Sequence, residues 1–284
     1  MMKRRKSIPW TIFIFAIAVM ALLWTLFPIY WMISTGLKTP LEVMNRPPSL
    51  WPVQPSLEGY AQIITGTVGV TPIYRFFINS VITSFATVFI ATAFAVLAAY
   101  ALSRLKFRFR KSVMMGVLMT QMFPMVVLLA PLYILYVRMD LLNTYRGLVL
   151  AFTSFALPFV IWMLKAFIDT IPQEIDQAAI VDGASTPRIL WQITIPLIMP
   201  GIVATAVFAF LDAWNNLLFA LTLVDEIGMR TLTPGLILAF DGEFKHDWSG
   251  MMATSSVVAL PVVLVFILLQ KYLIEGLTAG SVKD

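Results

Sequence analysis

Few side chains in this sequence could carry out covalent or metal chemistry. It has no cysteine and a single histidine, His246, which excludes thiolate catalysis, disulfides, iron–sulfur clusters and multi-histidine metal sites. It also has no phosphate-binding loop of the form G-x-x-x-x-G-K-[ST], no H-E-x-x-H and no nucleophile elbow. We therefore expect no catalytic residue, no metal site and no cofactor bound by this chain. If the protein uses ATP, another chain must hydrolyse it.

One acidic residue, Asp212, stands out because it interrupts the otherwise uncharged stretch 189–224. Asn215 and Asn216 follow at i+3 and i+4, which places all three polar side chains on one face of a helix. Carboxylates and amides can pair with sugar hydroxyls that have lost their water. We expect the three residues to line a cavity and Trp214 to point away and pack. The alternative is that the three residues hydrogen-bond to neighbouring helices and hold them together.

The composition indicates that lipid surrounds these residues. Sixty per cent of the residues are hydrophobic, only 12% are charged and the mean hydropathy is +0.86, whereas a soluble domain is about 25% charged. An ordinary soluble globule is therefore excluded. The net charge is +5, but the basic residues lie beside apolar runs and form no stripe with interleaved aromatics, so we expect no nucleic-acid partner.

The apolar runs predict an all-α membrane protein with six transmembrane helices. About 20 apolar residues cross the ~30 Å hydrocarbon core, and in lipid a helix satisfies all its backbone hydrogen bonds internally. We predict one domain over 1–284, with spans at about 8–36, 76–103, 112–137, 146–166, 201–224 and 249–272. The fifth span contains Asp212, and Pro196 and Pro200 before it predict a turn.

Basic residues predict the orientation, because they concentrate in short cytoplasmic segments. Residues 3–6 and the hairpin 104–111 are strongly basic, so we expect both termini and a loop at 169–196 to be cytoplasmic. The external loops are then 37–75, 138–145 and 225–248. We expect the first span to be retained, because it is too long for the apolar part of a signal peptide. The proline-rich segment 37–75 is predicted to be an ordered loop.

The cytoplasmic loop 169–196 reads as helix, turn, helix. Pro172 suits a helix start, and Glu174 and Asp176 place negative charge in the first turn, where the helix dipole favours it. Gly183 is predicted to end this first helix.

The second helix of the loop should begin at Pro187, with Ser185 or Thr186 as its N-cap, and Pro196 should stop it before the chain re-enters the membrane. On composition alone, this could equally be an amphipathic elbow lying on the membrane surface.

The spacing in this loop resembles the signature of binding-protein-dependent ABC importer permeases. That pattern is Glu-Ala-Ala, three residues, Gly, nine residues, Ile-x-Leu-Pro, and here Ala178-Ala179, Gly183 and 193–196 (Ile-Thr-Ile-Pro) keep the register. Gln177 replaces the usual Glu and Ile195 the usual Leu. Asp176 could supply the missing charge, although it would face about 100° away on the helix.

Three other segments resemble the carbohydrate branch of this family, specifically the smaller permease subunit of maltose-type importers. They are 77–80 (Phe-Ile-Asn-Ser), 214–216 (Trp-Asn-Asn) and the tail 275–284. The resemblance covers essentially the whole chain. It implies a non-catalytic subunit of an ATP-driven importer for sugars (mono-, di- or oligosaccharides, maltose- or trehalose-like) that works by alternating access in a bacterial or archaeal plasma (inner) membrane.

The resemblance also implies the partners and the residues that meet them. The partners are a second homologous permease, giving a heterodimer, two ATP-binding cassette subunits that carry ATP and Mg, an external sugar-binding protein, and membrane lipid. The residues expected to couple to the ATPase are Glu174, Asp176, Gln177, Ala178, Ala179, Asp182, Gly183, Ala184, Ile193 and Pro196. A loop expected to reach the binding protein comprises Phe240, Asp241, Gly242, Glu243 and Phe244, and a tail expected to touch the ATPase includes Gly280, Ser281 and Lys283. The companion permease is expected to make most of the sugar contacts, so direct contact through Asp212 is less favoured than cavity lining.

Other functions remain open at this point. An importer permease for a polyol or a phosphorylated glycerol compound would have much the same sequence. An ion-coupled secondary transporter is less favoured, because it would not need the elbow and would normally show inverted repeats.

Overall fold

The computed structural model describes residues 8–68, 70–242 and 245–279. The chain divides into two compact units. Unit 1 comprises Met1–Ile73 with Leu236–Leu260, and unit 2 comprises Tyr74–Gly235 with Pro261–Asp284. Two helices, α13 (Leu232–Phe240) and α14 (Trp248–Ala279), run from one unit into the other.

Unit 1 contains one long apolar helix, several short helices and strands, and the parts of α13 and α14 that fall within it. In chain order the elements are α1 (Ile8–Gly36), α2 (Pro40–Val43), α3 (Glu58–Thr65), β1 (Thr67–Val68), β2 (Thr71–Pro72), β3 (Asp241–Gly242) and β4 (Lys245–His246). The strands form two antiparallel hairpins, β1 with β2 and β3 with β4. The most apolar window of α1 has no buried residue, as expected for a helix that faces lipid all round.

Buried polar contacts hold the segment after α1. Glu42 is 8% exposed, and its Oε1 accepts hydrogen bonds from the Val53 N–H and the Ser49 hydroxyl, both at 2.8 Å. The Val53 N–H is the largest cause that keeps the pKa of Glu42 below its ordinary value of 4.5. Lys38 Nζ donates to the Ser49 carbonyl at 2.5 Å. The described part of the predicted loop 37–75 is therefore ordered, and α4 begins within it at Ile73.

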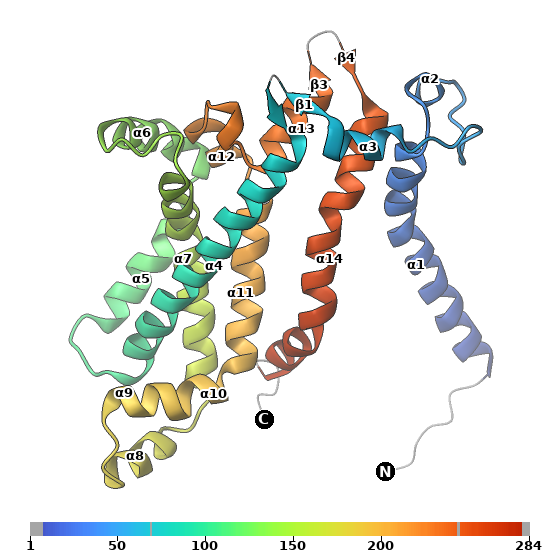
Figure 1. Cartoon of the computed structure of the whole chain (residues 1–284). Helices are drawn as coiled ribbons and strands as arrows, with labels where there is room; N and C mark the ends of the chain where they lie inside the picture. Colours follow the sequence, from blue (N-terminus) through green and yellow to red (C-terminus); the bar gives the residue numbers. More distant parts are fainter. Residues whose placement is uncertain (1–7, 69, 243–244, 280–284) are drawn as a thin grey trace. The chain divides into compact units, whose positions relative to one another are not determined.

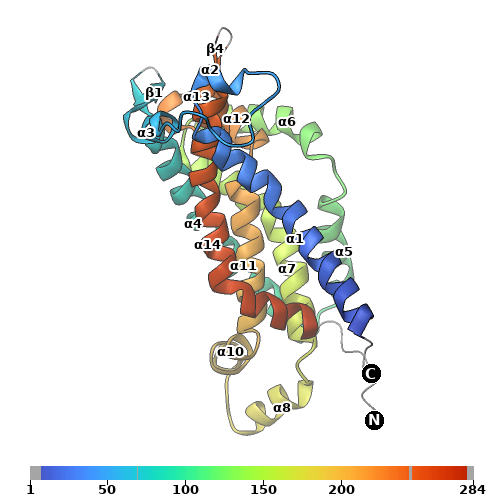
Figure 2. The ribbon, with the colours of Figure 1, turned by 90° about the vertical axis from the view of Figure 1, so that its right-hand side faces the viewer.

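Unit 2 holds the remaining helices (Figure 1). They are α4 (Ile73–Arg104, which starts at the unit boundary), α5 (Arg110–Thr120), α6 (Met125–Arg138), α7 (Tyr145–Asp169), α8 (Gln173–Val181), α9 (Thr186–Ile189), a π-helical turn (Leu190–Thr194), α10 (Ile195–Leu197), α11 (Met199–Trp214), α12 (Leu218–Leu223) and a 3-10 turn (Ile227–Met229). In both views α8 and α10 lie at one end of unit 2, and α6 and α12 lie at the other (Figures 1 and 2).

Helix α7 is the centre of unit 2 and contributes to two apolar clusters. At one end its residues Val160 and Leu164 pack with Ala95 and Ala99 of α4. At the other end α7 packs with α6, α11 and α12. Helix α11 crosses α7 closely because it has a glycine there: a Cβ on Gly201 would lie 2.5 Å from the ring of Phe167.

The helices agree with a protein that crosses a membrane. Within the described residues, α1, α4, α7 and α14 are long and apolar enough to span it. The number of spans rises to six if α5 with α6, bent by 95°, and α9–α10 with α11, bent by 78°, each count as one. Four of the six predicted apolar runs therefore correspond to these long helices, and the third and fifth runs fall on shorter helices.

The third predicted span, 112–137, is not one helix. It breaks between α5 and α6, after Gln121 and before Pro124. Proline has no N–H to donate, so the ladder of helical hydrogen bonds is interrupted there. The Gln121 side chain donates instead to the Phe155 carbonyl of α7 at 2.9 Å.

The fifth predicted span, 201–224, also differs from the structure. Helix α11 ends at Trp214, and α12 is a separate short helix. The Asn216 side chain explains the break, because its Oδ1 accepts the Phe219 N–H at 3.1 Å and so takes the place of a backbone acceptor at the start of α12.

The last predicted external loop, 225–248, contains more structure than a solvated connector. Its apolar part forms α13, and a short antiparallel hairpin follows. A Cβ on Gly235 of α13 would lie 2.4 Å from Phe76 of α4, so α13 packs closely against that helix.

Candidate functional site: a projecting elbow and a polar pocket

The predicted helix–turn–helix is present as an elbow, residues 173–197, at one end of unit 2 (Figure 1). Helix α8 ends at Val181, and Gly183 follows with φ +81°. Only glycine adopts this left-handed conformation without strain, so the prediction that Gly183 ends the helix is confirmed. Ser185 is the N-cap of α9, although its side chain makes no capping hydrogen bond.

Pro196 does not stop the second helix of the elbow, contrary to prediction. The helix runs through α9, a π turn and α10 to Leu197, and the chain bends at Ile198 before α11. The Ile195 N–H donates to the Leu190 carbonyl, the i to i−5 pattern of a π turn. Pro196 has no N–H to donate, and it follows directly on the π turn, where the regular i to i−4 ladder is already interrupted.

The elbow divides into an outer and an inner face. Ile180, Val181 and Trp191 are 61%, 86% and 65% exposed. Among the residues expected to couple to an ATPase, the exposed ones are Glu174, Gln177, Ala178, Asp182, Gly183 and Pro196, whereas Ala184 and Ile193 are half-buried and Asp176 and Ala179 are buried. The exposed residues of the elbow therefore include large apolar, small and charged side chains.

Asp176 does not supply a surface charge in place of Gln177. Its side chain is 12% exposed, and Oδ2 lies 2.6 Å from Nε of Arg104, the last residue of α4. Arg104 Nη2 also donates to the Ile171 carbonyl at 2.8 Å. The neighbouring Ser103 hydroxyl donates to Asp169 Oδ1 at 2.5 Å. The end of α4 thus holds both the last residue of α7 and the inner face of α8, a set of contacts that the sequence did not reveal.

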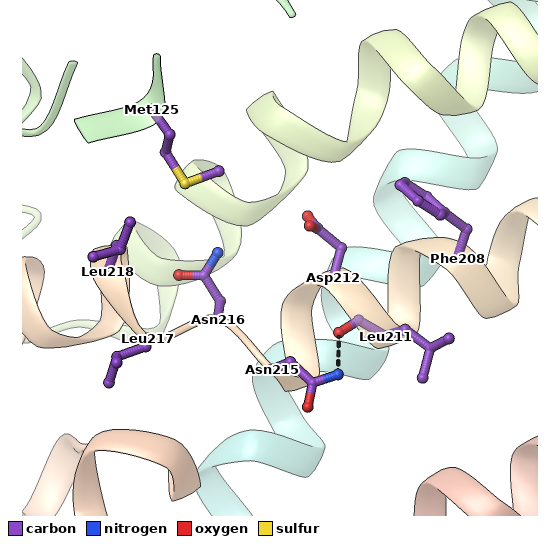
Figure 3. Close-up of a pocket in the computed structure, with 8 residues that line it drawn as sticks. All are labelled: Met125, Phe208, Leu211, Asp212, Asn215, Asn216, Leu217 and Leu218. Atoms are coloured by element: carbon purple, nitrogen blue, oxygen red, sulfur yellow. Dashed lines mark hydrogen bonds between the residues drawn. The ribbon is translucent and has the colours of Figure 1, made fainter. Parts of the chain in front are cut away.

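The predicted polar residues of the fifth span lie around one pocket. It has a volume of about 530 Å³ and is lined by Met125, Phe208, Leu211, Asp212, Asn215, Asn216, Leu217 and Leu218. Figure 3 shows the Asp212 carboxylate and the Asn216 amide on one side of the chain, toward Met125, and Asn215 on the other side. The three residues share a pocket as expected, but they do not form a single helical stripe, because α11 ends at Trp214.

The pocket residues differ in how far their hydrogen bonds are already committed. Asn215 Nδ2 donates to the Leu211 carbonyl at 2.9 Å, and Asn216 Oδ1 accepts the Phe219 N–H of α12. Asp212 is half-buried and has no hydrogen-bond or ion-pair partner among the described residues. Among the described residues, both oxygens of its carboxylate are therefore without a hydrogen-bond donor. Trp214 is 3% exposed and stacks on Phe210 at 5.3 Å, so its predicted packing role is confirmed.

A buried asparagine organises the other end of unit 2, and the sequence had marked it only by resemblance. Asn79 of α4 is fully buried, and its Nδ2 donates to the Gly228 and Arg230 carbonyls at 3.0 and 2.8 Å. Its Oδ1 accepts from the Tyr145 hydroxyl of α7 at 2.6 Å. Asn79 therefore fixes the segment between α12 and α13 against two long helices.

The other predicted contact residues are only partly described. Phe240 ends α13, and Asp241 and Gly242 form β3. Glu243 and Phe244 of the expected binding-protein loop, and Gly280, Ser281 and Lys283 of the expected tail, lie outside the described residues. Among the residues that are described, no group of three or more His, Asp or Glu side chains could hold a metal ion.

Comparison of the sequence with known proteins gives the same family from a family model and from individual relatives. Residues 91–278 match the model of the binding-protein-dependent transport system inner membrane component. The inner membrane ABC transporter permease protein YcjP of Escherichia coli is 36% identical over 259 residues, which cover 91% of each chain. The trehalose/maltose transport system permease protein MalG of Thermococcus litoralis is 31% identical over 266 residues, 94% of each.

A solved structure shares the fold. It comes from a bacterial ABC transporter involved in the import of the acidic polysaccharide alginate, and it matches with a TM-score of 0.78 over 94% of this chain and 98% of that one. The sequence identity is 23%, so the likeness establishes the fold alone.

Proposed function

The chain belongs to the family of binding-protein-dependent ABC transporter permeases, and from this premise we propose that it is one of two transmembrane subunits of an ATP-driven importer for sugars. It forms half of the translocation pathway and moves its solute by alternating access. The observation that carries the proposal is the elbow 173–197, which projects from one end of unit 2 and exposes apolar side chains there. An exposed apolar surface of this kind is typical of a protein or a membrane contact, and the family of the chain supports the protein contact.

The elbow is the proposed docking site for an ATP-binding cassette subunit. Val181 and Trp191 on its outer face are the anchors expected to enter a pocket on that partner, because large apolar side chains dominate such contacts. The small residues Ala178 and Gly183 allow the two backbones to approach closely. ATP and Mg belong to the partner, and two such subunits serve the two permeases.

The pocket around Asp212 is the proposed part of the solute pathway in this subunit. A carboxylate at this depth in a span is costly and usually faces a cavity or a partner. Desolvated sugar hydroxyls would donate to it. No basic residue lines the pocket, so a phosphorylated solute would meet a like charge, and a neutral sugar fits better than glycerol phosphate. The relative named for trehalose and maltose supports a maltose- or trehalose-like solute.

The proposed topology has six spans, formed by α1, α4, α5 with α6, α7, α11 with α12, and α14, and both termini lie in the cytoplasm of a bacterial or archaeal cell. The basic hairpin 104–111 lies at the same end of unit 2 as the elbow, which supports a cytoplasmic elbow. In this topology the segment 225–248 is external and is where a sugar-binding protein would dock, and a second homologous permease completes the pathway.

The test is affinity purification of the tagged chain from detergent-solubilised native membranes, followed by an ATPase assay of the purified material with a panel of sugars and with glycerol phosphate. The proposal predicts a co-purifying ATPase, a second permease, and ATP hydrolysis that rises with one sugar and its binding protein. A chain that purifies intact without an ATPase would contradict it, and stimulation by glycerol phosphate alone would contradict the sugar assignment.

A further inference from the structure

Helix α4 is the one long helix of unit 2 that could act as a stiff rod along its whole length. It runs for 32 residues with neither proline nor glycine in it, whereas α6, α7 and α14 each contain a proline. Proline is the commonest cause of a helix kink. From Asn79 to Arg104, α4 spans about 37 Å at 1.5 Å per residue.

Each end of this rod is fixed by buried polar contacts. At one end Arg104 lies 2.6 Å from Asp176 of α8 and donates to the Ile171 carbonyl of the connector between α7 and α8. At the other end Asn79 donates to the carbonyls of Gly228 and Arg230. The same helix therefore holds the elbow and the segment that leads into α13.

In the Arg104–Asp176 pair, no other described group compensates the charge of Asp176 when Arg104 is removed. The Arg104 and Asp176 side chains are 7% and 12% exposed. Neither Asp176 carboxylate oxygen receives a hydrogen bond from any described residue, so Arg104 is the group that compensates its charge. Removing one partner of such a pair leaves a buried charge uncompensated, which is far more disruptive than replacing both.

The two ends of α8 differ in how firmly they are held. Its inner face is tied to α4 through Asp176, but beyond its far end a Cβ on Gly183 would meet nothing within 4 Å, and Val181 is 86% exposed. If a partner pushes on the exposed end of α8, the contacts of Arg104 keep the connector 170–172 from bending. The displacement of α8 is therefore passed on to α4.

We propose that the Arg104–Asp176 pair is a mechanical brace that makes α4 move with the elbow, so that displacement of α8 is transmitted along α4 to the segment 228–230 held by Asn79. Arg104 and Asp176 are positioning residues, because they touch neither solute nor nucleotide. The brace rests on the proposed function, in which an ATPase moves the elbow. What it adds is the route of transmission and the two charges on which that route depends.

The first test measures coupling in the complete transporter in proteoliposomes, as sugar transported per ATP hydrolysed. The variants are Arg104→Gln, Asp176→Asn and the charge-swapped double variant R104E/D176R. Lys106→Gln is the control, because it removes an exposed positive charge two residues after Arg104. All variants are first checked for assembly and for ATPase activity.

The brace predicts that each single variant assembles and hydrolyses ATP but transports about fivefold less sugar per ATP or worse, the lower end of usual coupling between sites. The charge-swapped variant should recover most of the loss, and the control should match the wild type. Single variants with unchanged coupling, or a charge swap no better than the singles, would overturn the proposal.

A second measurement does not depend on transport. Because the chain has no cysteine, nitroxide labels can be placed at Gln173→Cys on α8 of the elbow and Leu97→Cys on α4, which are both exposed. The brace predicts a narrow distance distribution between the labels that broadens in Arg104→Gln but not in Lys106→Gln. Equal widths in all three would refute the brace. A broadened distribution in a complex that no sugar stimulates would instead support the brace and contradict the proposed function.

Discussion

Replacing Asn79 with alanine should loosen the segment between α12 and α13 while leaving the helices in place. Asn79 is fully buried and makes three hydrogen bonds, two as a donor to backbone carbonyls and one as an acceptor from Tyr145. Each buried group left without its partner costs about 1–3 kcal/mol. We therefore expect Asn79→Ala to lower the free energy of unfolding by about 3–5 kcal/mol.

Two further variants separate the contributions of Asn79. Tyr145→Phe removes only the accepted bond and should cost about 1 kcal/mol. Asn79→Asp keeps the acceptor for Tyr145 but turns a donor into a negative charge that faces two carbonyl oxygens, so it should cost at least as much as Asn79→Ala.

The assay is denaturant unfolding of the purified protein in detergent, with hydrogen exchange measured by mass spectrometry over residues 226–232. Exchange in that segment should rise strongly in both Asn79 variants and little in Tyr145→Phe. If Asn79→Ala costs no more than Tyr145→Phe, or if exchange in 226–232 does not change, Asn79 is not the fixing point that the hydrogen bonds indicate.

Three further outcomes follow from the structure. A Cβ on Gly36 would lie 2.7 Å from the Ala253 backbone, whereas one on Gly116 would meet nothing within 4 Å. Gly36→Ala should therefore destabilise the protein by about 1–3 kcal/mol, and Gly116→Ala should stabilise it by up to about 1 kcal/mol. Thermal unfolding measures both effects, and equal effects would refute the close approach of α1 and α14. The pKa of Glu42 is held below 4.5, chiefly by the Val53 N–H. The charged form of Glu42 therefore stabilises the fold above pH 4.5, and this stabilisation is lost as pH falls through the lowered pKa. The difference in unfolding free energy between wild type and Glu42→Gln should shrink on acidification, and a difference that is constant with pH would contradict the role given to the Val53 N–H. Asp212→Leu should leave assembly and basal ATP hydrolysis intact but lower sugar uptake about 10-fold or more, as expected for lost hydrogen bonds to a charged group; unchanged uptake would exclude Asp212 from the solute pathway.

Local sequence patterns predicted the positions of the helices better than the contacts between helices. The apolar runs gave the positions of the long helices, and Gly183 marked the end of α8 because a left-handed residue needs glycine. Two predictions from these patterns were wrong. Pro196 was expected to stop a helix, but the helix continues past it after a π turn. The run 112–137 was expected to be one span, but its helix is interrupted between Gln121 and Pro124. Hydropathy does not register such breaks, because the residues on both sides are apolar.

The long-range contacts could not be predicted from the sequence for a different reason. Arg104 closes an apolar run and reads as a topology signal, and Asp176 reads as a helix-dipole charge. Their pairing depends on how α4 crosses the elbow, which helical periodicity does not encode. Three of the residues that line the pocket, Asp212, Asn215 and Asn216, were expected to line a cavity. Their arrangement was not predicted, because the helix that carries Asp212 ends two residues later.

The central claim, that this chain is half of an ATP-driven sugar pathway, is tested most directly by uptake into proteoliposomes. The complete complex is reconstituted with its binding protein outside, and entry of labelled trehalose and maltose is measured with ATP or a non-hydrolysable analogue inside, and with an imposed proton or sodium gradient. The account predicts uptake with ATP and binding protein together, and none with the analogue or with either gradient alone. Uptake that follows an ion gradient without ATP would contradict it.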